Sequence, residues 1–290
     1  MVDKKGLFSF IGLTFVVSWL IMGGLWLAGG LAAGVVAAIA LIAIMWVPGL
    51  CVLAVTQLIT HEPMAVTGIR RLGIRRYYLW AWLLPVLLTL ASALLTWLLG
   101  AGRLDLSFPQ IREALEQAAA QVPGATQAQL PPVQAIIGAQ MAFALLLAPL
   151  INTFFALGEE LGWRGYLLHK LLPLGQWPAL VLSGAIWGIW HAPVVVMGHN
   201  YPGHPVLGPF LMVGFCLLAG IILGWLRLAS GSVWAPALAH GTFNALGGIS
   251  LLVLADMDLA IGGPVSSLIG WIGLAACVGW LVFTRRLPVK

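Results

Sequence analysis

Charged side chains are scarce in this sequence, which holds only 14 lysines and arginines and 9 acidic residues among its 290 positions. No segment is long and polar enough to form a separate soluble domain. Hydrophobic residues make up 61% of the chain, and its mean hydropathy is +1.02. This composition is typical of an integral membrane protein built from apolar helices.

Several common site signatures are missing as well. The three cysteines stand far apart inside apolar segments and form no CxxC pair, so they are expected to be buried small hydrophobes rather than zinc ligands. The sequence has no HExxH zinc-protease motif and no GxSxG serine elbow. A glycine-rich nucleotide-binding loop is also absent, which disfavours an ATP-driven pump and a nucleotide partner.

Long apolar runs occupy most of the chain. About 20 apolar residues span a bilayer as a helix, because lipid offers no hydrogen bonds to an open backbone. We therefore predict an all-α fold, a polytopic transmembrane bundle in which residues 1–290 form a single integral membrane domain. The expected spans, about eight in number, are 7–28, 34–58, 79–100, 134–158, 178–197, 208–228, 232–254 and 264–284.

Basic residues are unevenly divided between the two sides of this bundle. One side carries only two basic residues, Arg103 and Arg112, together with five acidic residues. The positive-inside rule then predicts that both termini are cytoplasmic. The net charge of +5 is then explained by basic residues that lie at the anionic lipid headgroups, and no nucleic-acid partner is expected. The basic residues on the side of the termini are Lys4, Lys5, Arg70, Arg71, Arg75, Arg76, Arg164, Lys170, Arg227, Arg285, Arg286 and Lys290.

That topology depends on the first apolar run, which we interpret as an uncleaved helix. Small residues around 28–33 resemble a signal-peptide cleavage site, which is the alternative, but the run is long for a signal peptide and more spans follow. Small residues also recur four apart, a spacing that lets membrane helices approach closely. These pairs are Gly30 and Gly34, Gly158 and Gly162, Gly184 and Gly188, and Gly220 and Gly224.

Ionisable and amide side chains within apolar segments are candidates for function, because hydrocarbon disfavours them. Three short motifs in the second half of the chain carry such residues. In chain order they contain Glu159, Glu160 and Arg164, then His191, and then His240 and Asn244. Carboxylates, imidazoles and an amide are together the groups of a hydrolytic site.

No proline interrupts the first motif, so the fourth helix is expected to continue through it. Glu160 and Arg164 are then i,i+4 neighbours that can form an ion pair. Glu159 is rotated from Glu160 by about 100° and stays available as a general base. The alternative is a charge cluster at the cytoplasmic end of the helix.

The two histidine motifs have functional and structural interpretations. His191 follows Trp187 and Trp190, which would shield a site from lipid and water; alternatively it is a packing histidine with its hydrogen bonds satisfied. His240 and Asn244 share one helix face and can donate hydrogen bonds to a developing oxyanion. Their alternative is a hydrogen-bonding pair between helices.

Together the three motifs resemble the signature of the CAAX protease and bacteriocin-processing family, which includes the type II CAAX prenyl endopeptidases. That signature is Glu-Glu-x-x-x-Arg, an aromatic-x-x-x-His and His-x-x-x-Asn on successive membrane helices. The sequence supplies it as Glu159-Glu160-Leu-Gly-Trp-Arg164, Trp187-Gly-Ile-Trp-His191 and His240-Gly-Thr-Phe-Asn244. The match covers roughly residues 145–250, with tryptophan at position 187 where phenylalanine is frequent.

The resemblance implies an intramembrane endopeptidase whose catalytic core is 145–250. By analogy with that family, Glu159 and His191 activate a water, and His240 and Asn244 hold the oxyanion. Glu160 and Arg164 support the site. The family has also been interpreted as metalloproteases, which would make Glu159, His191 and His240 zinc ligands. We favour a site without a metal or other cofactor, because an amide is an unusual zinc ligand and neither histidine has an evident carboxylate partner.

The expected substrate is a peptide or membrane protein that reaches the site in the bilayer, and it is prenylated only where the host makes such ends. We expect the site to open towards the cytoplasm of a bacterial or archaeal cell and the protein to lie in the inner (cytoplasmic) membrane. A non-enzymatic alternative is an immunity or scaffold protein that binds a peptide or partner with the same fold. A proton-relaying transporter is less favoured, because the polar residues are confined to one half of the chain.

Overall fold

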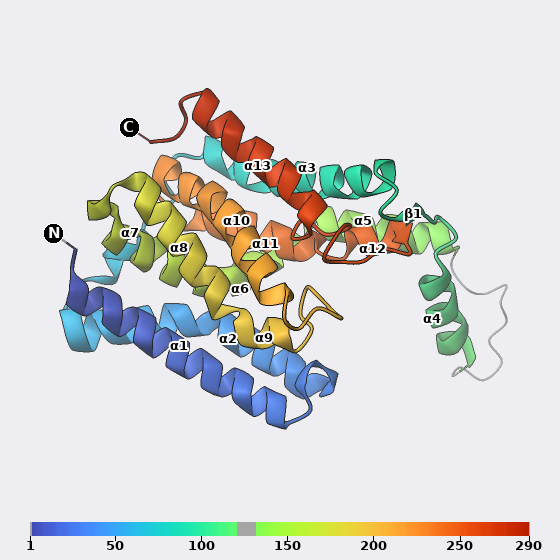
Figure 1. The fold of residues 1–290 in the computed structure, drawn as a ribbon, viewed down its shortest axis with the longest axis horizontal. Coiled ribbons are helices and arrows are strands. Elements are labelled where there is room, and N and C mark those ends of the chain that lie inside the picture. The colour runs from blue at the N-terminus through green and yellow to red at the C-terminus, as the bar shows by residue number, and fades with distance from the viewer. Residues whose placement is uncertain (1, 121–131, 290) are drawn as a thin grey trace.

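The fold is given by a computed structural model that describes residues 2–120 and 132–289. Its long helices run side by side along one axis and form an elongated bundle (Figure 1). Within the described ranges, the one sheet pairs two short antiparallel strands, β1 (Arg103–Leu104) and β2 (Leu254–Ala255). The predicted all-α membrane fold is therefore confirmed, and the chain is an integral membrane protein.

The helices follow one another with short connections. The first half holds α1 (Lys4–Leu27), α2 (Val35–Val55), α3 (Arg76–Leu98) and α4 (Pro109–Ala120). The second half holds α5 (Val133–Leu146), α6 (Ala148–Glu160), α7 (Leu168–Leu171), α8 (Gln176–Trp190), α9 (Ala192–Val196), α10 (Gly208–Ser230), α11 (Trp234–Leu246), α12 (Ile249–Val253) and α13 (Leu268–Phe283). Shorter 3-10 or π-helical segments are η1 (Gly30–Ala32), η2 (Thr56–Thr60), η3 (Met64–Thr67), η5 (Leu161–Leu167) and η6 (Leu172–Leu174).

Among the described residues, four helices are long and apolar enough to cross a membrane, namely α1, α2 with η2, α3 and α10. A fifth span results if α5 and the helix from α6 onward, bent by 43° at their junction, are taken as one. Three other predicted spans contain shorter helices, of 15 residues in α8, 13 in α11 and 16 in α13. Short helices prolong α8 and α11, so the eight-span count stays a prediction.

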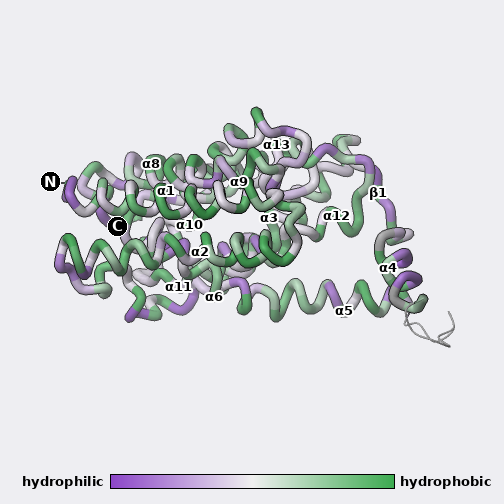
Figure 2. Tube along the Cα trace, turned by 90° about the horizontal axis from the view of Figure 1, so that it is seen from below, coloured by the Kyte–Doolittle hydropathy of each residue, from purple (hydrophilic) through white to green (hydrophobic). Residues whose placement is uncertain are grey.

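Large apolar side chains cover the outside of the bundle. Leu27 is 88% exposed, Val35 75% and Phe8 66%, which water would disfavour and lipid tails accommodate. The tube in Figure 2 is mainly hydrophobic along α1 and α2, and it is hydrophilic around β1 and α4. The apolar exterior along the bundle's length is thus the surface expected to face lipid.

Glycines allow the helices that carry the motifs to approach closely. A Cβ on Gly158 in α6 would lie 2.5 Å from a carbonyl oxygen of α2, and one on Gly220 in α10 would lie 3.0 Å from the Cα of Gly184 in α8. The predicted close packing is confirmed at these positions. It is wrong for Gly30 and Gly34, because both have positive φ and lie at the turn between α1 and α2, where a Cβ on Gly34 would meet no atom within 4 Å.

Both ends of the chain lie at the same end of the bundle (Figure 1). Lys170 donates to Asp3 at 2.8 Å and to Glu62 at 2.6 Å, which ties the start of α1 to α7. The backbone N–H of Gly6 and then the Lys170 ammonium hold the pKa of the Asp3 carboxyl below its usual value. The termini therefore share one side, as predicted; that this side is cytoplasmic stays a prediction, and Lys290 lies outside the described residues.

Candidate active site

The helix that carries the two adjacent acids does not end with them. It passes from α6 into the π-helical η5 and then into α7, so the predicted continuation through this motif is confirmed. A π-helical turn is frequent at functional sites, because it shifts the side chains that follow around the helix. Here Trp163, Arg164 and Tyr166 of η5 are at most 1% exposed, and they fill the bundle below the acids.

Glu160 is fully buried and its Oε1 has two partners. Arg164 donates to it from Nη1 at 2.8 Å, so the predicted i,i+4 ion pair is confirmed. The Nδ1 of His240 lies 2.9 Å from the same oxygen. The inference that neither histidine has a carboxylate partner is therefore wrong for His240. Glu160 and His240 are 80 positions apart, and only the packing of α6 against α11 brings them together.

Glu159 has a different environment from its neighbour. Its Oε2 accepts a hydrogen bond from the indole N–H of Trp187 at 2.8 Å, and the residue is 3% exposed. The Trp187 ring also lies 4.1 Å from the guanidinium carbon of Arg164. Trp187 thus connects the acid to the cation, a role that the sequence analysis missed when it assigned this side chain to shielding alone. The available signal was the tryptophan itself, which brings a donor where phenylalanine has none.

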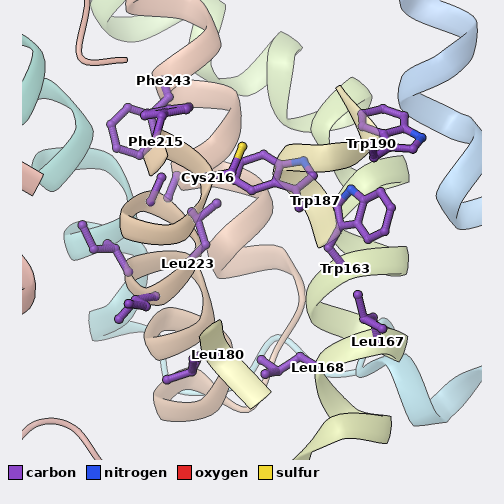
Figure 3. Close-up of a cluster of buried hydrophobic side chains, with 14 of the residues drawn as sticks. Trp163, Leu167, Leu168, Leu180, Trp187, Trp190, Phe215, Cys216, Leu223 and Phe243 are labelled. Atoms are coloured by element: carbon purple, nitrogen blue, oxygen red, sulfur yellow. The ribbon is translucent and has the colours of Figure 1, made fainter. Parts of the chain in front are cut away.

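Aromatic rings surround both histidines. The Trp187 ring centroid lies 5.5 Å from that of His191 and 5.3 Å from that of His240. Trp190 lies 4.7 Å from His191 and packs against Trp163, and all three tryptophans gather in one buried cluster (Figure 3). The expectation that Trp187 and Trp190 enclose the site agrees with this arrangement.

The hydrogen-bond partners fix which nitrogen of each imidazole carries a proton. The Nδ1 of His191 lies 2.8 Å from the Trp187 carbonyl oxygen, which only accepts, so Nδ1 donates and Nε2 of the neutral ring holds a lone pair. The Nδ1 of His240 likewise donates to the Glu160 carboxylate. Nε2 of His240 can then donate only from the imidazolium form, whose charge Glu160 stabilises.

One cavity of about 600 Å³ joins the four predicted catalytic residues, Glu159, His191, His240 and Asn244. His191 directly follows α8, and the predicted shared face of His240 and Asn244 is seen in α11, from which both reach the cavity. Asn244 is exposed there. The two supporting residues, Glu160 and Arg164, lie behind the cavity wall rather than in it.

The cavity extends from these residues to the end of the bundle that lies away from the termini. Its wall includes Leu31 between α1 and α2, Asn200 between α9 and α10, Gly248 between α11 and α12, and Val265 before α13. All four belong to connections at that end (Figure 1). The cavity therefore reaches the end of the molecule that lies opposite the chain termini.

This arrangement contradicts one pair of predictions. Cytoplasmic termini and a site that opens towards the cytoplasm cannot both be right in this fold. The inconsistency arose because the membrane-spanning part of the fourth helix was expected to end at residue 158, which put Glu159 near the inner membrane surface. The helix instead continues through η5, α7 and η6 to Leu174, so Glu159 lies well inside the bundle.

The alternative zinc ligands do not form a preorganised metal site. Glu159, His191 and His240 line the same cavity, yet nowhere in residues 2–120 and 132–289 do three His, Cys, Asp or Glu side chains group closely enough to hold a metal ion. The Nδ1 atoms of both histidines are engaged in hydrogen bonds. These bonds leave Nε2 of each ring as the nitrogen that could hold a metal, an arrangement common in zinc sites. The chemistry proposed below uses side chains alone.

Comparisons with known proteins select the same part of the chain. The model of the family described as type II CAAX prenyl endopeptidase Rce1-like matches residues 136–246. The CAAX prenyl protease 2 of Methanococcus maripaludis is 34% identical over 92 residues, which cover 30% of this chain. The chain spans 31% of the length of that relative. The resemblance of residues 136–246 to the CAAX protease family is thus confirmed.

Proposed function

Because the segment that carries Glu159, His191, His240 and Asn244 matches the CAAX protease family, we propose that the protein is an intramembrane endopeptidase. The observation that carries the proposal is the cavity of about 600 Å³, which gathers Glu159, His191, His240 and Asn244 at one place inside an apolar bundle. Ionisable groups at such a depth are expected to serve function, because they are costly to keep. Hydrolysis of a peptide bond is the chemistry that a base, an acid and oxyanion donors perform together.

The attacking water is held between Glu159 and His191. Oε2 of Glu159 is bound to Trp187, which leaves Oε1 to accept a proton from the water. Nε2 of His191 holds a lone pair and accepts the second hydrogen bond of that water. Attack of the oxygen on the carbonyl carbon forms the tetrahedral intermediate, while the proton moves to the Glu159 carboxylate.

The negative charge on the former carbonyl oxygen is stabilised from α11. Nε2–H of the His240 imidazolium and the amide N–H of Asn244 are the two donors, one helical turn apart. Glu160 and Arg164 hold the His240 ring in place through the hydrogen bond at Nδ1. Collapse of the intermediate breaks the C–N bond, and Glu159 returns its proton to the leaving amine.

The substrate is a peptide or a membrane protein whose extended segment enters the cavity. The name of the archaeal relative describes a CAAX prenyl protease. For this chain a lipidated end becomes a substrate only in a host that makes one. We propose a bacterial or archaeal cytoplasmic membrane as its location, which the archaeal source of that relative supports.

Cleavage of a quenched-fluorescence peptide library by the purified protein tests the proposal. Wild-type protein should cleave, and Glu159→Gln should lower kcat by about 10²–10⁴-fold, the usual contribution of a general base. Glu116→Gln, which removes an exposed carboxylate of α4, is the matched control and should cleave normally. Equal turnover in wild type and Glu159→Gln would reject the mechanism, and wild-type protein that binds but never cleaves would favour the scaffold alternative.

A further inference from the structure

The two ends of the bundle differ in charge as well as in openness. The end with the cavity mouth carries the acidic residues Asp105, Glu113, Glu116, Asp256 and Asp258 and the basic residues Arg103 and Arg112. The end with the chain termini carries ten of the described lysines and arginines, namely Lys4, Lys5, Arg70, Arg71, Arg75, Arg76, Lys170, Arg227, Arg285 and Arg286. Translocation disfavours basic connections, and anionic lipids of the inner leaflet attract them, so the basic end is expected on the cytoplasmic side.

The cavity is closed towards that basic end. Below Glu159 and Glu160 the π-helical η5 places Trp163, Tyr166 and Leu167, each 0% exposed, across the interior. Arg164 is paired with Glu160 in the same layer. A peptide therefore has no open route to Glu159 from the end that holds the termini.

We infer that the cavity opens on the face of the membrane opposite the cytoplasm and receives a peptide segment presented from that side. The substrate class is then an exported peptide or the outer part of a membrane protein. The identification of this segment as a substrate rests on the proposed function; the direction of the mouth does not. The inference replaces the predicted cytoplasmic opening and keeps the predicted cytoplasmic termini.

Cysteine labelling tests the direction of the mouth without relying on activity. The native cysteines Cys51, Cys216 and Cys277 are buried, so the wild type gives the background. Single cysteines are introduced at Leu251, which lines the cavity, at Val206 in the connection between α9 and α10, and at Leu72 at the basic end. These side chains are 44%, 78% and 63% exposed. A membrane-impermeant maleimide is applied to intact cells and again after permeabilisation.

The inference expects Val206→Cys and Leu251→Cys to be labelled in intact cells and Leu72→Cys only after permeabilisation. The reverse pattern would overturn it by placing the mouth in the cytoplasm. Labelling of Val206→Cys in intact cells with Leu251→Cys protected until permeabilisation, or throughout, would overturn it as well, because the cavity would then not open at this end. An outward mouth on a purified protein that cleaves nothing would reject the proposed function and leave the direction of the mouth standing.

Discussion

The wall and the floor of the cavity contain similar groups in different surroundings. The wall holds Glu159, His191, His240 and Asn244, all of which line the open space. The floor is the layer of Glu160 and Arg164 with the rings of η5, where the acid is paired with the guanidinium and with His240. The comparison teaches that two adjacent carboxylates can have different roles. Glu160, paired through Oε1 with a guanidinium and an imidazole, fixes structure, whereas Glu159, bound only by an indole N–H, stays available for chemistry.

The largest expected effect is the loss of stability when the ion pair in the floor is removed. Arg164→Ala leaves the Glu160 carboxylate without its cation at 0% exposure, so the folded state should lose about 3–5 kcal/mol, the usual result of removing one partner of a buried ion pair. Thermal melting in detergent measures the loss as a lower Tm. Arg75→Ala, at an exposed position, is the matched control. An unchanged Tm for Arg164→Ala would show that the floor is not held by this pair.

A substitution in the wall should lower kcat and leave the Tm unchanged. Asn244→Ala removes one oxyanion donor and should lower kcat by about 10²–10³-fold, with KM and Tm nearly unchanged. The control is Asn200→Gly, another asparagine of the cavity wall, where glycine accommodates the φ of 63°. A kcat that falls no further in Asn244→Ala than in this control would remove Asn244 from the mechanism.

Trp187 joins wall and floor, and its substitution should have a smaller effect. Trp187→Phe keeps an aromatic ring and loses the hydrogen bond to Glu159, a loss of about 1.5 kcal/mol that corresponds to roughly a tenfold lower kcat at similar KM. Trp190→Phe is the matched control, because its buried indole N–H has no hydrogen-bond partner among the described residues. If both variants lowered kcat equally, the ring rather than the N–H would be what matters.

Metal removal should have the smallest effect. A mechanism that uses only side chains predicts full turnover after dialysis against a strong chelator and no gain from added zinc. The measurement is the initial cleavage rate before chelation, after it, and after restoration of the metal. Turnover that disappears with the chelator and returns with zinc would make Glu159, His191 and His240 metal ligands and overturn the assignment of the base.

What the sequence could predict was local. The Glu160–Arg164 pair and the common face of His240 and Asn244 follow from i,i+4 spacing, and the helix through the acids follows from the absence of proline. The hydrogen bond between Glu160 and His240 does not, because tertiary packing rather than spacing decides it. The depth of Glu159 in the bundle was not predictable for a related reason: it depends on where the helix from α6 ends, and that end lies at Leu174.

The most direct test of the division between wall and floor makes the same substitution at both neighbours. Glu159→Gln and Glu160→Gln are purified in parallel, and peptide cleavage and thermal melting are measured on the same samples. The account predicts that Glu159→Gln keeps the wild-type Tm and loses cleavage, whereas Glu160→Gln lowers the Tm because Arg164 loses its buried counter-charge. Two variants with the same Tm and the same residual cleavage would contradict it.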